Sequence, residues 1–576
     1  MLPTGKLLLI AGSGNDRKLF QAGEFKTLVY DPETGNTKLV MTPGDVFCGG
    51  HTYLPDGNLL VAGGTRDYEV LQPDATRAGG PVKITNTGTD PMIVTKGAMF
   101  VSKKTGKKFR SDAEITIPPV EITKSGKRIP GTRNVWVDSV LPGSAGTVDM
   151  FDRYKITSFS TDVSSFLYGD AGPLKIQKKD YSGIRNSYEF NPFTEKYERV
   201  GDLEYARWYP TLTGLPDGHV MAFSGLDEAG QILQGQTEEY LPRAKKWIER
   251  RDLRQYFATY PAIFSTTRPN TLFYAGANSG YGSPDLGRTP GFWDLTDNTF
   301  TKVPGMRDAD QLETAGATWA GPVNDQKIMV VGGGGQGESP HSTGRIDIVD
   351  LKAAAPRFSP AAMLPDGTRY PSLSQLPGGD VLITGGSRDY RGKGGSDIKK
   401  TYIYRVATGK LDEMAEPNVG RDYHSSSVLL PTGQVMTIGS DPLYADAEGT
   451  RSGKFEKRLE IYTPNFLFRA DGNKVVRPTI TAGPEQLNAG EKATFTIGST
   501  DNSVPKIASV RLMFPSAVTH MTDPNQRSVD IGFEQQGSTL RMAIPHDRAL
   551  LPRGYYMIFL NDVSGVPSIA TWVKVV

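Results

Sequence analysis

The sequence predicts an all-β protein in which a seven-bladed β-propeller is followed by a C-terminal immunoglobulin-like β-sandwich. The main observation is a motif that recurs seven times: a tight turn, four or five apolar residues and a closing glycine. Successive copies begin about 52 to 56 residues apart, except for one gap of about 161 residues, and a spacing near 50 is typical of kelch-type propeller blades. The copies begin at Gly5, Gly57, Gly218, Asn270, Gln326, Gly379 and Gly433.

Each copy has the features of a buried inner strand. Its apolar run is short, partly β-branched and bounded by turn residues, which favours a strand over a helix. More polar strand-and-turn segments lie between the copies and are expected to form the outer strands of four-stranded blades. Radial stacking of such blades buries the apolar strands and leaves only short edges. We therefore expect the propeller to occupy residues 1–470.

Two parts of the chain depart from this repeat. The long gap predicts an insertion of about residues 67–187 folded onto the second blade, and its basic tract KKTGKKFR is more typical of a solvated face than of a binding site. After the last copy, Glu456–Phe468 is expected to supply a strand that closes the ring against the first blade. From Pro478 onward, short alternating strands predict a β-sandwich over residues 471–576.

Chemically distinctive side chains occupy one register of the repeat. Counting back nine positions from the copy starts gives Cys48, Tyr209, Tyr370 and His424, while Tyr260 and Tyr423 sit one position earlier in their own copies. Equivalent positions of radially repeated blades lie at equal height around one axis. We therefore expect a thiol, phenols and an imidazole to meet at one end of the central channel, although they are far apart in the sequence.

Four short motifs carry these residues or add to them. They are Val-Phe-Cys-Gly-Gly-His at Val46–His51, Ala-Arg-Trp-Tyr-Pro-Thr at Ala206–Thr211, Arg-Asp-Tyr-His-Ser at Arg421–Ser425 and Val-Thr-His-Met-Thr at Val518–Thr522. In this order they resemble the motifs of the galactose oxidase and glyoxal oxidase family of copper radical oxidases, closest to its bacterial glyoxal-oxidase-like branch. The resemblance covers nearly the whole chain apart from the long gap.

The resemblance implies a role for each of five residues. Tyr209 would be an equatorial copper ligand and the seat of a radical, with Cys48 joined to its ring by a thioether. Tyr423 would be the axial ligand, and His424 and His520 would supply two imidazoles. Such a nitrogen and oxygen set in tetragonal geometry suits Cu(II). A free tyrosine has a pKa of about 10, so a bound cation is needed to form the phenolate near neutrality.

The resemblance also implies an activity. A protein of this kind would oxidise small aldehydes of the glyoxal or glycolaldehyde type, or primary alcohols that could derive from carbohydrates, with O2 and release hydrogen peroxide. Tyr423 would take the substrate proton, and the Tyr209 radical would take a hydrogen atom. We further expect a monomer that is extracellular or held at the cell surface. No signal peptide is visible, and the chain is expected to be trimmed because it begins in the middle of the first repeat.

Some residues have a plainer interpretation. A lone cysteine is usually a small buried hydrophobe, and Tyr370, which matches no motif, is expected to line the channel or support its structure. His51 is expected to lie behind the ligands, a common arrangement around metals. Galactose oxidase places a tryptophan over the crosslinked tyrosine where this chain has Asp227, which argues against galactose specificity. Trp208 and Trp293 are the alternatives for covering the ring.

Other functions are alternatives to a copper oxidase. A kelch propeller without catalysis could act as a carbohydrate- or protein-binding module, because fold does not fix function, but this leaves the four motifs unexplained. A hydrolase would need paired carboxylates in the channel, and no register position carries one. The formal charge of +2 gives no electrostatic case for nucleic acid. No apolar run approaches the roughly 18 residues of a membrane span, and a single cysteine excludes an intrachain disulfide framework.

Overall fold

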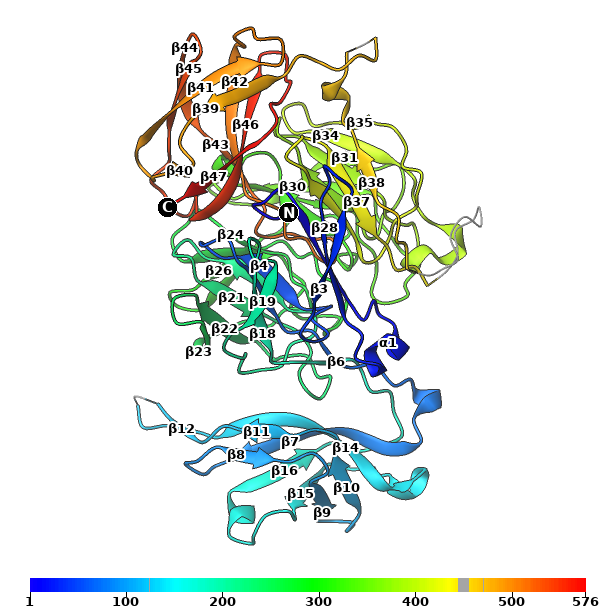
Figure 1. Cartoon of the computed structure of the whole chain (residues 1–576). Coiled ribbons are helices and arrows are strands. Elements are labelled where there is room, and N and C mark those ends of the chain that lie inside the picture. Colours follow the sequence, from blue (N-terminus) through cyan, green and yellow to red (C-terminus); the bar gives the residue numbers. More distant parts are fainter. Residues whose placement is uncertain (124, 444–454, 470) are drawn as a thin grey trace.

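Strands dominate the structure, a computed structural model that describes residues 1–123, 125–443, 455–469 and 471–576. The expectation of an all-β protein is confirmed, because the only α-helix among the described residues is the short α1 (Arg17–Gln21). That part of the chain holds no helix with the length and apolarity needed to cross a membrane. A large main body lies between a C-terminal sandwich at one end and a small barrel at the other (Figure 1).

The main body consists of antiparallel sheets that follow one another along the chain. The first sheet contains β1 (Leu7–Gly12), β2 (Lys26–Tyr30) and β3 (Thr37–Met41). The second contains β4 (Gly50–Tyr53), β5 (Leu59–Ala62), β18 (Ser187–Asn191) and β19 (Lys196–Arg199). The third contains β20 (Thr211–Gly214), β21 (Val220–Phe223), β22 (Gln236–Leu241) and β23 (Lys246–Arg254). The fourth contains β24 (Ile263–Ser265), β25 (Thr271–Tyr274), β26 (Gly291–Asp294) and β27 (Thr299–Lys302).

The later sheets repeat the same order. The fifth contains β28 (Gly316–Trp319), β29 (Lys327–Val331), β30 (Arg345–Asp350) and β31 (Phe358–Met363). The sixth contains β32 (Ser372–Gln375), β33 (Val381–Thr384), β34 (Thr401–Arg405) and β35 (Lys410–Glu413). The last contains β36 (Ser425–Leu429), β37 (Val435–Gly439) and β38 (Glu460–Tyr462). Strand β38 pairs with β37, and Leu459 just before it packs in one cluster with Leu7 of β1. That Glu456–Phe468 closes the ring against the first sheet stays a prediction.

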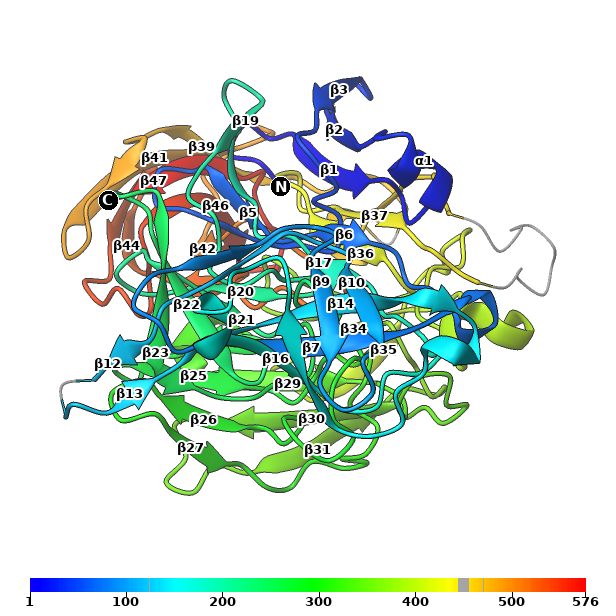
Figure 2. The same cartoon turned by 90° about the horizontal axis from the view of Figure 1, so that it is seen from below.

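The apolar run of each motif becomes a central strand of its sheet. Strands β5, β21 and β33 are buried along their whole length, as expected for short apolar runs covered on both faces. The first strands of neighbouring sheets contact one another: β4 with β20, β20 with β24, β28 with β32, and β32 with β36. Seen from below, the sheets succeed one another around the body with the barrel in front (Figure 2). Their number as seven blades stays a prediction.

The long gap contains a closed barrel of six strands in the order β10-β14-β7-β16-β15-β9. Their bounds are β7 (Arg77–Asn86), β9 (Met99–Ser102), β10 (Lys108–Ser111), β14 (Gly131–Pro142), β15 (Asp152–Ile156) and β16 (Leu167–Ala171). The barrel has a hydrophobic cluster of its own, which includes Phe100, Phe109 and Tyr154. Two short pairs, β8 (Met92–Val94) with β11 (Ile115–Ile117) and β12 (Glu121–Ile122) with β13 (Arg128–Ile129), accompany it.

The barrel docks against the third sheet, whereas we expected the insertion to fold onto the second. The chain enters the barrel after β6 (Thr65–Asp67) and returns through β17 (Ser182–Gly183), which pairs with β6. The Gly183 N–H donates to the Asp227 carbonyl at 3.0 Å, which ties this return to the loop between β21 and β22. Arg133 of the barrel lies 3.6 Å from the Glu204 carboxylate just before β20. The entry and return strands therefore carry the barrel towards the third sheet.

The C-terminal region forms two packed sheets. One contains β39 (Pro478–Ala482), β41 (Lys492–Ser499), β45 (Thr539–Ala543) and β44 (Gly532–Gln536). The other contains β40 (Gln486–Leu487), β47 (Thr571–Val575), β46 (Gly554–Asp562), β42 (Ile507–Met513) and β43 (Ser528–Asp530). The connection from β42 to β43 reaches the main body, where the Asn525 amide accepts from Gly214 N–H and donates to the Leu212 carbonyl of β20, both at 2.8 Å.

Candidate metal centre

Residues of the predicted register share an unusual backbone turn before the first strands of their sheets. Cys48, Tyr209, Tyr260, Tyr370 and His424 all have positive φ angles, between 47° and 66°. Such angles are uncommon for residues other than glycine. They cost on the order of 1–3 kcal/mol each and cluster at functional sites, where surrounding structure holds them in place. The shared turn is the structural counterpart of the shared sequence register.

Backbone hydrogen bonds connect these turns from one sheet to the next. The Tyr209 N–H donates to the Cys48 carbonyl, and the Tyr260 N–H donates to the Tyr209 carbonyl, both at 2.9 Å. The Tyr370 N–H donates to the carbonyl of Thr314, which also has positive φ, at 2.9 Å. Counting nine positions back does not find Thr314, because a 3-10 turn at residues 323–325 lengthens the connection in that sheet.

Five predicted side chains meet at one point. The hydroxyl of Tyr209 hydrogen-bonds the hydroxyl of Tyr423 and lies 3.4 Å from Nε2 of His424. Nε2 of His424 lies 2.8 Å from Nε2 of His520. The sulfur of Cys48 and one nitrogen of each of these imidazoles lie within 4.8 Å of one another. The structure therefore places two phenol oxygens, two imidazole nitrogens and a thiol together, and their roles as ligands stay a prediction.

His520 reaches this point on a loop from the sandwich. It has a positive φ of 49°, as does the following Met521 at 69°. Its ring stacks on Tyr260 with centroids 4.1 Å apart, and the Thr519 hydroxyl lies 2.7 Å from its Nδ1. The carboxylate of Asp523 accepts hydrogen bonds from elsewhere in the loop, including the Ala517 N–H at 2.7 Å. The stacking on Tyr260 and the contact with Thr519 therefore orient the His520 imidazole without a bound metal.

Burial sets the protonation of the site. It lowers the pKa of His424, and it lowers the pKa of His520 well below its ordinary value, with the His424 charge as a smaller cause. Both imidazoles are therefore neutral at pH 7, which is the form that binds metals. Burial also raises the pKa of the Tyr423 phenol and that of the Cys48 thiol well above their ordinary values. These two groups therefore need a cation beside them to ionise near neutrality.

The donor set fits copper. A cysteine with two histidines would by itself suit zinc, but the phenol oxygens of Tyr209 and Tyr423 lie at the same point. Imidazole nitrogens combined with oxygens in a tetragonal set favour Cu(II). The backbone bond between Tyr209 and Cys48 keeps the thiol beside the tyrosine. The residues present could hold Cu(II) through His424, His520 and the two phenols.

A carboxylate that the sequence analysis missed orients one imidazole. Oδ2 of Asp441 lies 3.0 Å from Nδ1 of His424, which leaves Nε2 facing the other donors. Arg391 forms an ion pair with the same oxygen at 3.0 Å, and Asn15 donates to it at 3.1 Å. Ligating histidines usually donate their second N–H to such a partner. In the sequence, Asp441 follows Gly439-Ser440, where three of the other copies have a glycine pair, and this departure is only a weak signal.

Asp441→Ala should weaken copper binding by about 10- to 100-fold, the usual cost of removing a partner behind a metal-bound histidine. The physical reason is that the His424 ring loses the acceptor that fixes its tautomer and orientation. Copper affinity would be measured by competition with a chelator of known affinity. Asp366→Ala is the matched control, because it removes an aspartate paired with Arg388 away from the site. Equal affinities of the two variants would contradict this role.

An aromatic stack covers the Tyr209 ring. The ring of Trp208 lies parallel to it with centroids 3.4 Å apart, and Tyr181 stacks on the other face of Trp208 at 4.7 Å. Trp293 instead packs near Phe223, with centroids 5.7 Å apart. Of the two tryptophans considered for this place, the structure selects Trp208. A tryptophan next to Tyr209 in the chain thus takes the covering position that the sequence could not assign.

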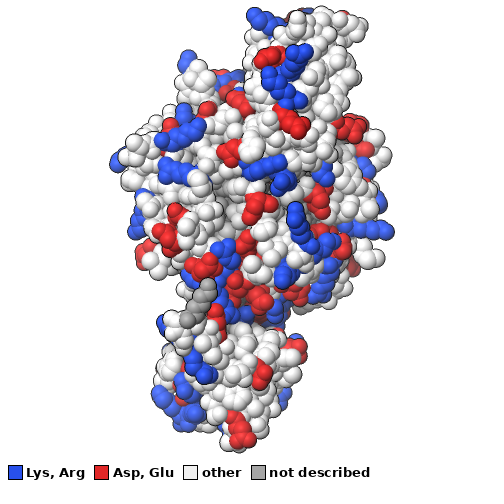
Figure 3. All heavy atoms as spheres, turned by 90° about the vertical axis from the view of Figure 1, so that its left-hand side faces the viewer, with Lys and Arg blue, Asp and Glu red and all other residues white. Residues whose placement is uncertain are grey.

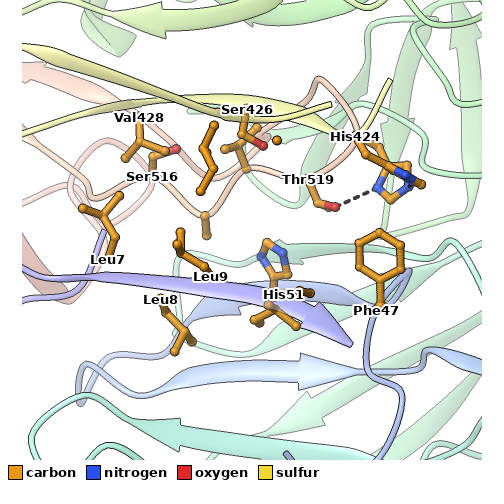
Figure 4. A pocket seen from close by; sticks show the side chains of 18 of the residues that line it. Leu7, Leu8, Leu9, Phe47, His51, His424, Ser426, Val428, Ser516 and Thr519 are labelled. Carbon is orange, nitrogen blue, oxygen red and sulfur yellow. Dashed lines mark hydrogen bonds between the residues drawn. The ribbon is translucent and has the colours of Figure 1, made fainter. Parts of the chain in front are cut away.

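A cavity of about 180 Å³ borders the donor cluster. Its walls are mostly apolar side chains, among them Leu7 and Leu9 of β1 and Val428 of β36, and His51 also lines it (Figure 4). Nδ1 of His51 is buried without a hydrogen-bond partner. Burial lowers the pKa of His51 to about 4, so this imidazole is neutral. His51 lies beside the donor cluster but is not one of the converging donors.

Two segments of the chain match family models. Residues 477–575 match the model described as galactose oxidase-like, Early set domain, and residues 77–174 match the model described as GlxA beta barrel domain. The first range coincides with the sandwich and the second with the six-stranded barrel. The sandwich and the barrel therefore each match a domain of a known family.

Relatives that match about two thirds of the chain agree with these models. A galactose oxidase from Gibberella zeae is 25% identical over 399 residues, which are 65% of this chain and 55% of that protein. An aldehyde oxidase from Arabidopsis thaliana is 24% identical over 65% of this chain and 64% of that protein. An aldehyde oxidase from Vitis pseudoreticulata is 26% identical over 70% of this chain and 80% of that protein. The matched region thus spans about half to four-fifths of these relatives.

A solved structure has the same fold. It is a fungal alcohol oxidase of the AA5 family in complex with copper, with a TM-score of 0.57 and 17% identity. The superposition covers 87% of this chain and 99% of that protein. At this identity the likeness shows the arrangement of the strands alone.

Proposed function

The chain belongs to the galactose oxidase and glyoxal oxidase family, and from this premise we propose that it is a copper radical oxidase. Its substrates would be small aldehydes of the glyoxal or glycolaldehyde type or primary alcohols. The observation that carries the proposal is the convergence of Tyr209, Tyr423, His424 and His520 with Cys48 beside them. Placement in a bacterial branch, location outside the cell and a monomeric state stay predictions.

The chain's own residues divide the chemistry between them. Tyr423, as a phenolate, would accept the proton of the substrate hydroxyl, and an oxidised Tyr209 would take a hydrogen atom from the neighbouring carbon. Copper would supply a place for the substrate oxygen and accept the second electron. The substrate thereby loses two hydrogens, which O2 takes up as hydrogen peroxide. Trp208 would shield the oxidised ring from water, since it lies flat against it.

The proposed cofactor also includes a bond between Cys48 and the Tyr209 ring. These residues share one buried cluster and a backbone hydrogen bond, which supports their reaction with each other. Forming a carbon–sulfur bond removes one hydrogen from the thiol and one from the ring, and O2 would be the oxidant. A sulfur substituent on the ring would ease its one-electron oxidation.

Copper-treated, aerobically matured protein should be lighter than copper-free protein by two hydrogens. The thioether replaces one S–H and one C–H bond, so intact-mass spectrometry of metal-stripped samples measures it directly. Cys48→Ser is the matched control and should show no loss, because its hydroxyl cannot form the bond. The same samples would be tested for peroxide with glyoxal, glycolaldehyde and primary alcohols. An unchanged mass together with no peroxide would support a non-enzymatic binding module instead.

A further inference from the structure

A cavity of about 510 Å³ lies in the seam between the barrel and the third sheet. Its volume falls in the range of ligand-binding pockets. The barrel contributes Lys83, Asn134 and Phe151, and the main body contributes Tyr205 and the loop between β21 and β22. Figure 3 shows the narrow waist between the main body and the barrel, with charged side chains of both signs gathered around it. No site described above uses this cavity.

Two residues that line the cavity each have a buried acceptor atom without a hydrogen-bond partner. The atoms are Oε2 of Glu228 and Oε1 of Gln236. The Glu228 residue is only 8% exposed. Buried polar atoms are nearly always paired, so an unpaired one indicates a missing partner such as a ligand or an ordered water. Because both atoms are acceptors, that partner must bring hydrogen-bond donors.

The neighbouring Asp227 is already satisfied and orders the loop. Its Oδ1 accepts from the Ala229 and Gln231 N–H groups at 2.8 and 2.9 Å, and its Oδ2 accepts from the Asn134 amide of the barrel at 2.9 Å. The loop is therefore fixed across the seam. The next residue, Glu228, also lines the cavity, and its Oε2 has no hydrogen-bond partner.

The cavity wall carries charges of both signs. Lys83 and Arg133 line it together with Asp170, Asp227 and Glu228. A ligand with a strong net charge would meet like charges on one side or the other. An uncharged ligand rich in hydroxyl groups avoids this penalty and still supplies donors to the two unpaired acceptors.

An aromatic ring also lines the cavity. Phe151 lines the cavity and is 61% exposed, so its ring is open to a ligand. A sugar ring has a face of C–H groups that can pack against an aromatic ring, with hydroxyls around its edge. A second cavity of about 490 Å³ shares Arg133 with the first and extends the seam. The pair of cavities favours an oligosaccharide over a single sugar.

We propose that the seam between the barrel and the third sheet binds a neutral oligosaccharide. Its hydroxyls donate to Glu228 and Gln236, and one ring lies on Phe151. Ile232, another residue on the cavity wall, also packs against the cluster that contains Trp208 and Tyr209. A glycan held here therefore lies directly behind the aromatic cover of the donor cluster. Binding at the seam does not require copper.

Copper-free protein would be titrated calorimetrically with cellotetraose, maltotetraose and tetra-N-acetylchitotetraose. At least one should bind with a dissociation constant of about 1 mM or below. Glu228→Ala removes an acceptor and Phe151→Ala removes the stacking ring, and each should weaken binding about tenfold, the scale of one well-formed interaction. Asp149→Ala is the matched control, because it breaks an ion pair with Lys175 on the barrel and neither residue lines either cavity. It should bind as the unchanged protein does.

Three results would overturn the proposal. One is no binding of any oligosaccharide up to about 10 mM, which lies far above the expected constant. Another is binding that neither Glu228→Ala nor Phe151→Ala weakens, which would place the glycan elsewhere. The third is tighter binding of an uncharged glycine-serine peptide, which would assign the seam to polypeptide. Phe151→Ala keeps the test valid even if Glu228→Ala unfolds, because Phe151 is largely exposed. All three results leave the copper chemistry untouched.

Discussion

Tyr209→Phe is expected to abolish the radical absorption of the copper-loaded, oxidised protein together with all turnover. The substitution removes the phenol oxygen that lies among the imidazole nitrogens, and with it both a ligand and the oxidisable group. The ring itself remains, so its stacking on Trp208 and the packing of the cluster should persist. Visible absorption after chemical oxidation and the rate of peroxide release with glycolaldehyde are the two measurements.

Tyr423→Phe is the matched comparison, because it removes the hydroxyl that hydrogen-bonds Tyr209. Copper should still bind and the Tyr209 radical should still form, while turnover falls by about 10²- to 10⁴-fold, as is typical on losing a positioned general base. The ratio of turnover to radical yield therefore separates the two tyrosines. A radical band in Tyr209→Phe, or normal turnover in Tyr423→Phe, would show that the assigned roles are wrong.

The site was more predictable from the sequence than the fold around it. Cys48, Tyr209 and His424 could be found because each repeat places one residue in the same left-handed turn before a first strand, so sequence register becomes spatial proximity. Counting nine positions back does not reach Thr314, because the connection between β28 and β29 contains an additional 3-10 turn. A fixed count of positions works only where the intervening loop keeps its length.

The residues that support the donor cluster were harder to predict from the sequence. Asp441 acts through His424 from a loop that follows the strand, where no repeat position constrains it. The choice of Trp208 over Trp293 depends on how the chain turns at Tyr209, which composition and spacing do not encode. The approach of His520 was predictable only through the motif around it. Its loop comes from the sandwich, whose docking on β20 rests on long-range contacts of Asn525.

The barrel was the least predictable part. Its closure requires β9 to pair with β10 and β15, and β7 to pair with β14 and β16. None of these pairings follows from periodicity, because the strands are irregular in length and lack a repeat. A single sequence does not say which of these strands are neighbours.

His520→Ala should cost the protein its tight copper binding while leaving the main body folded. The substitution removes one of two imidazole nitrogens that face each other at 2.8 Å. A lost ligand should weaken binding by more than the 10- to 100-fold typical of a lost outer partner. The loop keeps its other anchors, since Asn525 still bonds to β20 and Asp523 still accepts from Ala517. Copper affinity by chelator competition and thermal unfolding of the copper-free protein measure the two effects separately.

His51→Ala is the matched control for this prediction. It removes another largely enclosed neutral imidazole that lines the same cavity, but its ring is not one of the converging donors. Its copper affinity should therefore stay close to that of the unchanged protein, although its stability can fall because a packed ring is lost. If His520→Ala kept full affinity, or if His51→Ala lost as much, His520 would not be a copper ligand. The sandwich would then hold the loop against the main body for structural reasons alone.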